Sequence, residues 1–209
     1  MHKFFNLLKE IYYLHKYGNY ISKVFKNNSK INNDKKDLII VELNNLYGSH
    51  IAYSYILDKL KKKFLTNNIG LFKSSFDSNS YHYTLHKILN FFNLHYYKWY
   101  KSMGNSKFIF HRMDKKLNKY KKYLKKIKNR KNLLEFKIDG ILYGDLIYDS
   151  YLRYNTEHTL TVNDKKFKIF FLKSIAYYFF CKDLFEKHNI HCVLLSHTVY
   201  LPAILGRIA

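Results

Sequence analysis

The stretch that decides the fold is LIIVE, Leu38 to Glu42, which is followed by the turn-forming sequence LNNLYGSH up to His50. Four consecutive apolar and mostly β-branched residues are typical of a strand that is buried on both faces. Ala52, Ile56 and Leu60 then recur at helical spacing. A buried strand that leads into a helix begins a strand–helix–strand unit, so the sequence predicts a parallel sheet.

The same alternation recurs along the chain. Further strands are predicted at 69–72, 107–110, 140–143 and 192–195, with a small edge strand at 159–162. Helices are predicted at 49–64, 85–92 and 115–131, and a long helix follows a cap at Asn163 or Asp164 and has Asn189 as its C-terminal cap. The sequence therefore predicts an α/β fold, a Rossmann-like, doubly wound, mostly parallel sheet with helices on both faces.

A length of 209 residues suits one full hydrophobic core. Residues 1–36 combine a helical apolar spacing with the polar linker KNNSKINNDKK, so we expect a helical extension there and a Rossmann-like domain over 37–209. Pro202 can begin a short helix that leaves Ile204 and Leu205 uncovered. This exposure suggests that the chain is the front part of a longer protein.

The formal net charge is +22, and only four of the 37 basic residues are arginine. A field of this sign attracts nucleic acid, anionic membranes and other anionic ligands. Lysine, asparagine, isoleucine, tyrosine and phenylalanine are abundant, and all have A/T-rich codons, so the charge can also reflect genome composition. Both interpretations remain open.

Several classes of protein lack support. The apolar content is too high for a disordered chain, no apolar run approaches the roughly 18 residues of a membrane span, and no signal peptide is visible, so we expect a soluble, cytoplasmic protein. Cys181 and Cys192 form neither a disulfide framework nor a zinc motif.

GxGxxG, P-loop, GxSxG and Asp-x-Asp motifs are missing, so we expect no cofactor. His82 and His86 have a spacing that a metal could use, but no third ligand is evident, so we expect no metal site.

Polar side chains follow three of the predicted strands, at Glu42 to His50, Gly144 to Arg153 and Ser196 to Tyr200. The carboxyl ends of parallel strands meet at one edge of a sheet, so these segments are expected to converge on a binding site. Asp145 and Asp149 share a helix face if the segment is helical. Equally, Asp145 can cap that helix and Asp149 can pair with Arg153.

Four segments carry a family resemblance: LIIVELNNLYGSHIAYSYILDKL, WYKSMG, GILYGDLIYDSYLRY and VLLSHTVYLPAILGRIA. They resemble the N-terminal half of bacterial surface-carbohydrate (capsule or lipopolysaccharide) biosynthesis proteins of glycosyltransferase-B type. The distinctive pattern is GD-aliphatic-YDxYLR, then SHxxY, then a glycine and RxA. The resemblance covers residues 37 to 209.

The resemblance implies an enzyme whose N-terminal half holds a glycan or lipid-linked acceptor and whose C-terminal half binds a nucleotide sugar. That second half would be missing here, so the chain alone is expected to be inactive. In an inverting mechanism a base takes the proton of the acceptor hydroxyl, and the candidates for catalysis are Asp145, Asp149 and His197. The candidates for substrate binding are Glu42, Gly48, His50, Gly144, Tyr148, Arg153, Ser196 and Tyr200.

Two alternatives compete with transfer of a sugar. A basic helix at 115–131, with Tyr120 and Tyr123 available to stack on bases, would suit nucleic acid. An N-terminal helix with Lys9, Lys16 and Lys23 would suit an anionic membrane surface. His197 and Glu42 also have structural interpretations, as a loop histidine bonded to the backbone and as a carboxylate that faces a helix N-terminus.

Overall fold

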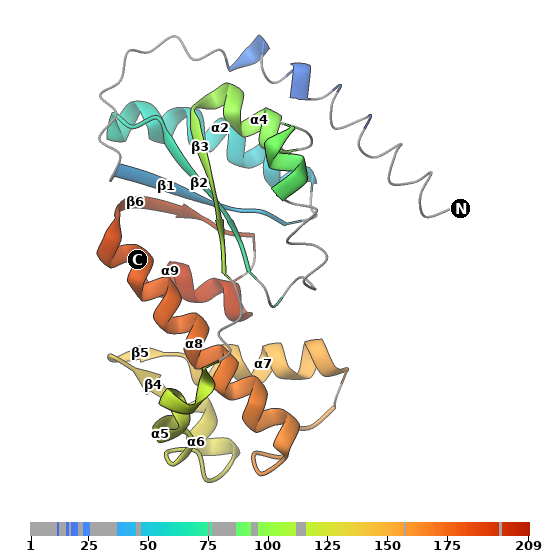
Figure 1. The fold of residues 1–209 in the computed structure, drawn as a ribbon, viewed down its shortest axis with the longest axis vertical. Coiled ribbons are helices and arrows are strands. Elements are labelled where there is room, and N and C mark those ends of the chain that lie inside the picture. Colours follow the sequence, from blue (N-terminus) through green and yellow to red (C-terminus); the bar gives the residue numbers. More distant parts are fainter. Residues whose placement is uncertain are drawn as a thin grey trace. The chain divides into compact units, whose positions relative to one another are not determined.

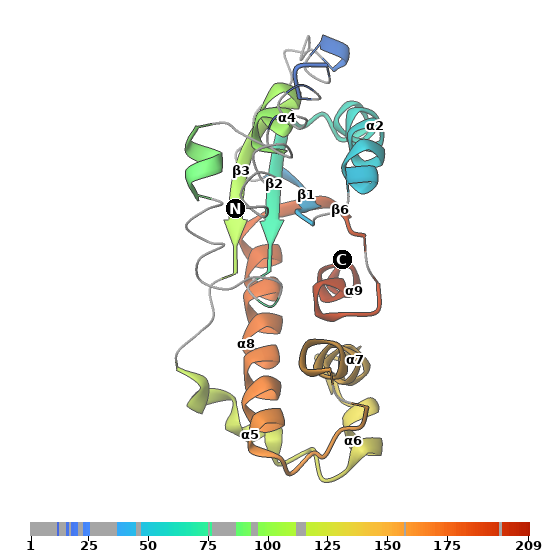
Figure 2. The ribbon, with the colours of Figure 1, turned by 90° about the vertical axis from the view of Figure 1, so that its right-hand side faces the viewer.

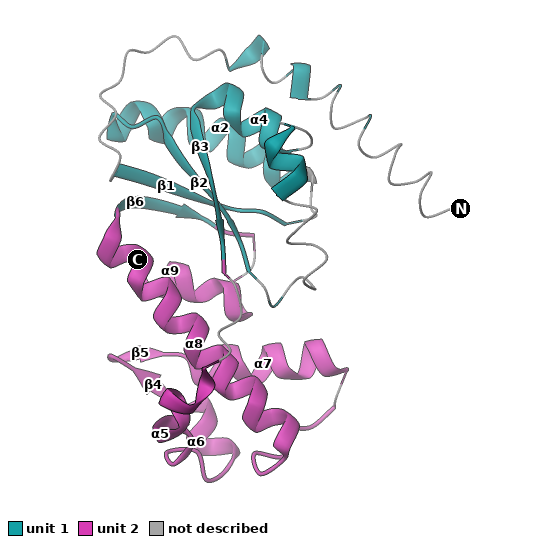
Figure 3. Cartoon of the chain, in the orientation of Figure 1, with its two compact units in different colours: residues 1–110, 189–194 teal, residues 111–188, 195–209 magenta. Residues whose placement is uncertain are grey.

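The computed structural model describes residues 12, 16, 18–20, 23–25, 37–44, 47–74, 76, 87–92, 96–111, 116–156, 158–196 and 198–209. The chain divides into two compact units (Figure 3). Unit 1 contains residues 1–110 and 189–194, and unit 2 contains residues 111–188 and 195–209.

Unit 1 is built on a four-stranded sheet in the order β3-β2-β1-β6, in which every pair of strands is parallel (Figure 1). The elements along the chain are β1 (Asp37–Glu42), α2 (Tyr47–Phe64), β2 (Asn68–Lys73), α4 (Tyr96–Met103), β3 (Asn105–Phe110) and β6 (Asn189–Leu194). The sheet is flanked by helices, and the predicted fold class is confirmed. Strand order reverses between β1 and β6, the position where open α/β sheets bind ligands.

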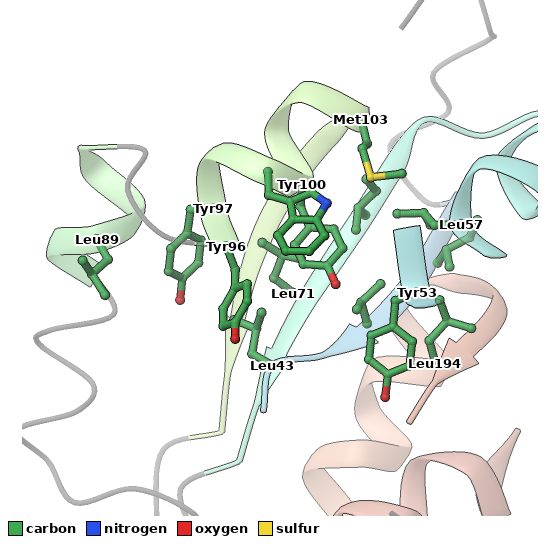
Figure 4. Packing of buried hydrophobic residues seen from close by; sticks show 14 residues of the cluster. Leu43, Tyr53, Leu57, Leu71, Leu89, Tyr96, Tyr97, Tyr100, Met103 and Leu194 are labelled. Carbon is green, nitrogen blue, oxygen red and sulfur yellow. The ribbon is translucent and has the colours of Figure 1, made fainter. Parts of the chain in front are cut away.

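The core of unit 1 joins one face of the sheet to two helices (Figure 4). Val41 on β1 and Leu71 on β2 are fully buried against Tyr53 and Leu57 of α2. The aromatic helix α4 adds four buried rings, those of Tyr96, Tyr97, Trp99 and Tyr100. The alternate positions Leu38, Ile40 and Phe72 are also buried. Burial of both faces explains why β1 and β2 are continuous apolar runs.

Unit 2 is mainly helical (Figure 2). Its elements are the 3₁₀ helix η2 (Leu117–Tyr120), α5 (Lys121–Leu124), α6 (Arg130–Leu134), β4 (Lys137–Ile138), β5 (Ile141–Leu142), α7 (Gly144–Asn155), α8 (Lys165–Lys187), the 3₁₀ helix η3 (Leu201–Ala203) and α9 (Ile204–Ile208). The predicted cap at Asp164 is confirmed, because its carboxylate accepts a hydrogen bond from the backbone N–H of Lys166. Phe167, Phe171 and Tyr177 on α8 are fully buried.

The prediction of a fourth parallel strand at 140–143 is wrong. Only Ile141–Leu142 forms a strand, and it pairs antiparallel with Lys137–Ile138 in a separate two-stranded sheet. Asp139 and Gly140 between them have φ angles of 52° and 81°. Positive φ at both central residues is the mark of a type I′ hairpin, for which Asp-Gly is a preferred pair. The apolar run therefore closes a hairpin instead of crossing the large sheet.

Four smaller predictions also need correction. Residues 159–162 do not form a strand, and the described part of 115–131 is not one helix but η2, α5 and the start of α6. The long helix ends at a C-cap at His188, and Asn189 already belongs to β6. Ile204 and Leu205 are fully buried, so the exposure expected for them is wrong. Most of residues 1–36 lie outside the described residues.

Within the described residues, none of the helices combines the length and the apolar content that crossing a membrane requires.

Candidate functional site

The candidate site in unit 2 is one face of α7. Asp145, Asp149 and Arg153 follow one another at intervals of four residues, so they share a side of the helix. The opposite side is buried through residues such as Ile147. Ser150 is also buried, and its hydroxyl accepts a hydrogen bond from the backbone N–H of Leu201 at 2.8 Å, which fixes the segment before α9 against α7.

Asp145 is held by Arg207 from α9. Nη1 and Nη2 of the guanidinium donate to the two carboxylate oxygens at 2.7 Å each, and Nη1 also donates to the carbonyl of Leu142 at 2.7 Å. Partial burial acts to raise the pKa of Asp145, but the hydrogen bonds from Arg207 and from the backbone N–H of Leu146 outweigh it and hold the pKa below its usual value. Asp145 is thus an ionised anchor and not the N-cap, which is Tyr143.

Asp149, one turn along α7, is in a different state. No ion pair joins it to Arg153 or to any other described residue, so of the two alternatives for Asp149 the structure does not contain the pairing with Arg153. Desolvation by the surrounding protein and repulsion by Asp145 raise the pKa of Asp149, although Arg207 opposes the shift. A carboxylate with a raised pKa, on an exposed position, is the better proton acceptor of the two.

Arginine is rare in this chain, and three of the four arginines contact α7 or belong to it. The guanidinium of Arg153 lies 4.2 Å from the ring centroid of Tyr200, and that of Arg130 lies 4.7 Å from the ring centroid of Tyr148. Arg207 pairs with Asp145. Stacking and forked pairing are geometries that lysine cannot reproduce. All three arginines that the structure describes therefore make contacts that depend on the planar guanidinium.

Gly144 has a packing role at the start of α7. A Cβ at this position would lie 1.5 Å from the carbonyl oxygen of Leu133 at the end of α6. The backbone N–H of Gly144 also donates to the carbonyl of Phe136 at 3.0 Å. The glycine therefore lets α7 approach α6, which explains its position without any ligand.

Unit 1 has a second polar group at the carboxyl end of its sheet. Glu42 and Lys73, which end β1 and β2, are both buried, and the Lys73 ammonium donates to the carbonyl of Leu43 at 3.0 Å. His50 is completely buried; its Nδ1 lies 2.7 Å from the Tyr100 hydroxyl and its Nε2 lies 3.1 Å from the Asn44 carbonyl.

The hydrogen bonds of His50 define its tautomer. A carbonyl can only accept, so Nε2 carries the proton and Nδ1 accepts from the Tyr100 hydroxyl. Desolvation lowers the pKa of His50 to about 4, against weaker support from the Asn44 carbonyl. The neutral imidazole thus bonds Asn44 after β1 through Nε2 and Tyr100 of α4 through Nδ1, so it joins these two segments. Gly48, by contrast, has no atom within 4 Å of the point that a Cβ would occupy, so the N-terminus of α2 is open there.

The predicted site residues fall into two groups. Glu42, Gly48 and His50 belong to unit 1, whereas Gly144, Asp145, Tyr148, Asp149, Arg153, Ser196 and Tyr200 belong to unit 2. His197 lies outside the described residues. The structure brings Asp145, Asp149, Arg153 and Tyr200 together around α7.

Three residues that make these contacts are not among the predicted site residues. Arg207 and Arg130 contact α7 in unit 2, and Lys73 bonds the Leu43 carbonyl in unit 1. The scarcity of arginine in the sequence could have drawn attention to the first two. Lys73 could have been noticed as the charged end of an apolar strand, IGLFK.

Among the described residues, no group of three His, Cys, Asp or Glu side chains could hold a metal ion. His82 and His86 lie outside the described residues.

No protein-family model, no curated protein and no solved structure matches the chain.

Proposed function

We propose that this protein acts in the biosynthesis of a surface polysaccharide, capsule or lipopolysaccharide, as a glycosyltransferase-like protein whose α7 face binds the glycan acceptor. The observation that carries the proposal is the unequal state of two carboxylates on one helix face. Asp145 is neutralised by a forked pair with Arg207, while Asp149 has a raised pKa and no ion pair with any residue that the structure describes. In this proposal Asp145 is the structural anchor and Asp149 is the general base.

The parallel sheet of unit 1 supports the proposal at the level of fold. The order β3-β2-β1-β6 is that of one half of a doubly wound domain, an architecture that serves many nucleotide- and sugar-binding proteins. Fold alone does not define a reaction. The chemistry is therefore argued from α7.

In the proposed reaction, Asp149 takes the proton of an acceptor hydroxyl as its oxygen attacks the anomeric carbon of a nucleotide sugar. The new bond joins that carbon to the acceptor oxygen, the bond to the diphosphate breaks, and the nucleoside diphosphate leaves with the electron pair. Arg153, stacked on Tyr200, holds an oxyanion of the acceptor, because a stacked guanidinium keeps N–H groups for phosphate or carboxylate.

A binding measurement with charge-matched variants tests the proposal. The probe is N-acetylglucosamine joined through a diphosphate to a short isoprenoid, with N-acetylglucosamine and the isoprenoid diphosphate as separate controls. The Kd for the complete probe is expected to be lower than for either part. Arg153→Gln should weaken binding about tenfold, the value of one charge-assisted hydrogen bond.

The matched control is Lys107→Gln, which removes the same charge from an exposed position on β3. It should leave the Kd within about twofold. Equal losses of affinity for the probe in Arg153→Gln and Lys107→Gln would show that only net charge matters and would overturn the proposal. Failure of the wild-type protein to distinguish the probe from the isoprenoid diphosphate would overturn it as well.

A further inference from the structure

The strongest charged surface in the described residues lies in unit 2, between Lys116 and Lys131. Nine of these 16 residues are basic and none is acidic, whereas the whole chain has 37 basic residues in 209. Eight of the nine are lysines. We name this the lysine surface, and its exposed members are Lys116, Lys119, Lys121, Lys122, Lys125, Lys126, Lys128, Arg130 and Lys131.

The apolar side of the same segment is buried within unit 2. Tyr120 stacks on Phe179 of α8 with ring centroids 5.6 Å apart, and Tyr123 packs edge-on against Phe136 at 6.3 Å. Ile127 is buried too. Because the apolar residues point into unit 2, the lysines of η2 and α5 are left on its outside.

Three lysines of this surface lie over the rings of Tyr120 and Tyr123. The ammonium of Lys119 lies 4.8 Å from the ring centroid of Tyr120, and those of Lys122 and Lys126 lie 5.3 and 5.8 Å from that of Tyr123. Cation–π contacts of this kind restrain flexible side chains. These three lysines are thus held beside the rings of Tyr120 and Tyr123, on the outside of unit 2.

We infer that the lysine surface docks this protein onto a bilayer of anionic phospholipids. Lysine is a point charge that adapts to a mobile layer of phosphate head groups, and a cluster of four to eight lysines is the usual requirement for such binding. Nucleic acid fits less well. The two tyrosines that could stack on bases are packed against Phe136 and Phe179, so the expected stacking platform is not present.

The docking surface is linked to the α7 face through Arg130. This residue begins α6 at the end of the lysine surface, and its guanidinium packs on Tyr148 of α7. Arg130 therefore joins the lysine surface to α7 within unit 2. The docking itself does not depend on the proposed function.

Vesicle flotation with the full chain tests this inference. Wild-type protein should float with vesicles of 30% phosphatidylglycerol in phosphatidylcholine and not with pure phosphatidylcholine, and 0.5 M NaCl should abolish the binding. The quadruple variant Lys121→Gln, Lys125→Gln, Lys128→Gln, Lys131→Gln should bind more than about a hundredfold more weakly, at roughly fivefold for each lysine.

A second quadruple variant supplies the control. Lys59→Gln, Lys87→Gln, Lys101→Gln and Lys107→Gln remove the same charge from exposed positions of unit 1. This variant should keep most of the vesicle binding, and circular dichroism should show both variants folded. Equal losses in the two variants, or no wild-type flotation, would overturn the inference. So would a gel shift of poly(U) that is tighter than vesicle binding and is lost only in the first variant.

Discussion

Arg207 of α9 donates two parallel hydrogen bonds to Asp145 of α7, from Nη1 to Oδ1 and from Nη2 to Oδ2, each 2.7 Å long. The two side chains are 29% and 32% exposed, so the pair is only partly screened by water. The same guanidinium also bonds the Leu142 carbonyl at the end of the β4–β5 hairpin. One side chain therefore joins three elements of unit 2.

Asp145→Asn should destabilise the protein, because it removes the charge from both hydrogen bonds. The expected loss in free energy of unfolding is about 1 to 2 kcal/mol, measured by urea denaturation at pH 7. Asp183→Asn is the control, since Asp183 forms an exposed pair with Lys187 on α8. Its effect should be at most about 0.5 kcal/mol. Similar losses in the two variants would contradict the anchoring role of Asp145.

Asp149→Asn should have the opposite effect on stability. The pKa of Asp149 is raised, so the folded protein binds this proton more tightly than the unfolded chain does, and the ionised carboxylate is unfavourable at pH 7. Because the residue is exposed, the gain should be no more than about 0.5 kcal/mol. The amide should bind the acceptor probe within about threefold of wild type, since a base acts only in the reaction. A clear loss of stability would show that Asp149 has a structural partner.

Gly144→Ala should be strongly destabilising. The new methyl group would meet the Leu133 carbonyl oxygen at 1.5 Å, so α6 or α7 must move. We expect the free energy of unfolding to fall by roughly 3 kcal/mol or more, because the methyl group overlaps a backbone atom and not a side chain that could rotate away. Gly48→Ala is the matched control at the N-terminus of α2, where the space is open; it should be neutral or stabilising by up to about 1 kcal/mol. The midpoint of urea unfolding checks both.

Stability should fall between pH 6.5 and pH 4 because of His50. Burial lowers its pKa from 6.5 to about 4, so in this window the unfolded chain binds a proton that the folded protein does not. The stability contributed by this difference is present above pH 6.5 and is lost as the pH falls, by roughly 3 kcal/mol at most.

Urea unfolding of wild type and His50→Gln at several pH values measures this effect. The variant should show a shallower slope between pH 4 and 6.5, whatever its stability at pH 7. Parallel slopes would mean that His50 titrates normally in the folded protein. Asp145 acts in a separate window, because its pKa is held below 3.8, and the stability it contributes is lost only at lower pH.

The large sheet could be predicted from sequence because its signal is local. Leu38 to Val41 and Ile69 to Phe72 are apolar throughout, and a run of this length is typical of a strand buried on both faces. The hairpin at Asp139-Gly140 carried an equally local signal, a preferred type I′ pair. The residues that follow it, Ile141 to Tyr143, resemble the start of a buried strand, and this pattern favours the wrong element.

The candidate site was only partly predictable. The spacing of Asp145, Asp149 and Arg153 identifies a common helix face without any structure. The pair of Asp145 with Arg207 joins residues 62 positions apart, and no local pattern encodes it. The same holds for Arg153 and Tyr200, whose contact depends on how the segment after β6 returns to α7.

The acceptor-binding role of α7 is tested most sharply by titrating ¹⁵N-labelled protein with the N-acetylglucosamine diphosphate isoprenoid and following NMR chemical shifts. We predict that the largest saturable shifts fall on the backbone amides of Asp145 to Arg153 and of Tyr200, and that in Arg153→Gln the same shifts reach half-saturation only at an about tenfold higher concentration of the probe. Shifts spread evenly over the lysines of both units, or concentrated at the N-terminus of α2, would contradict the assignment of α7 as the acceptor-binding face.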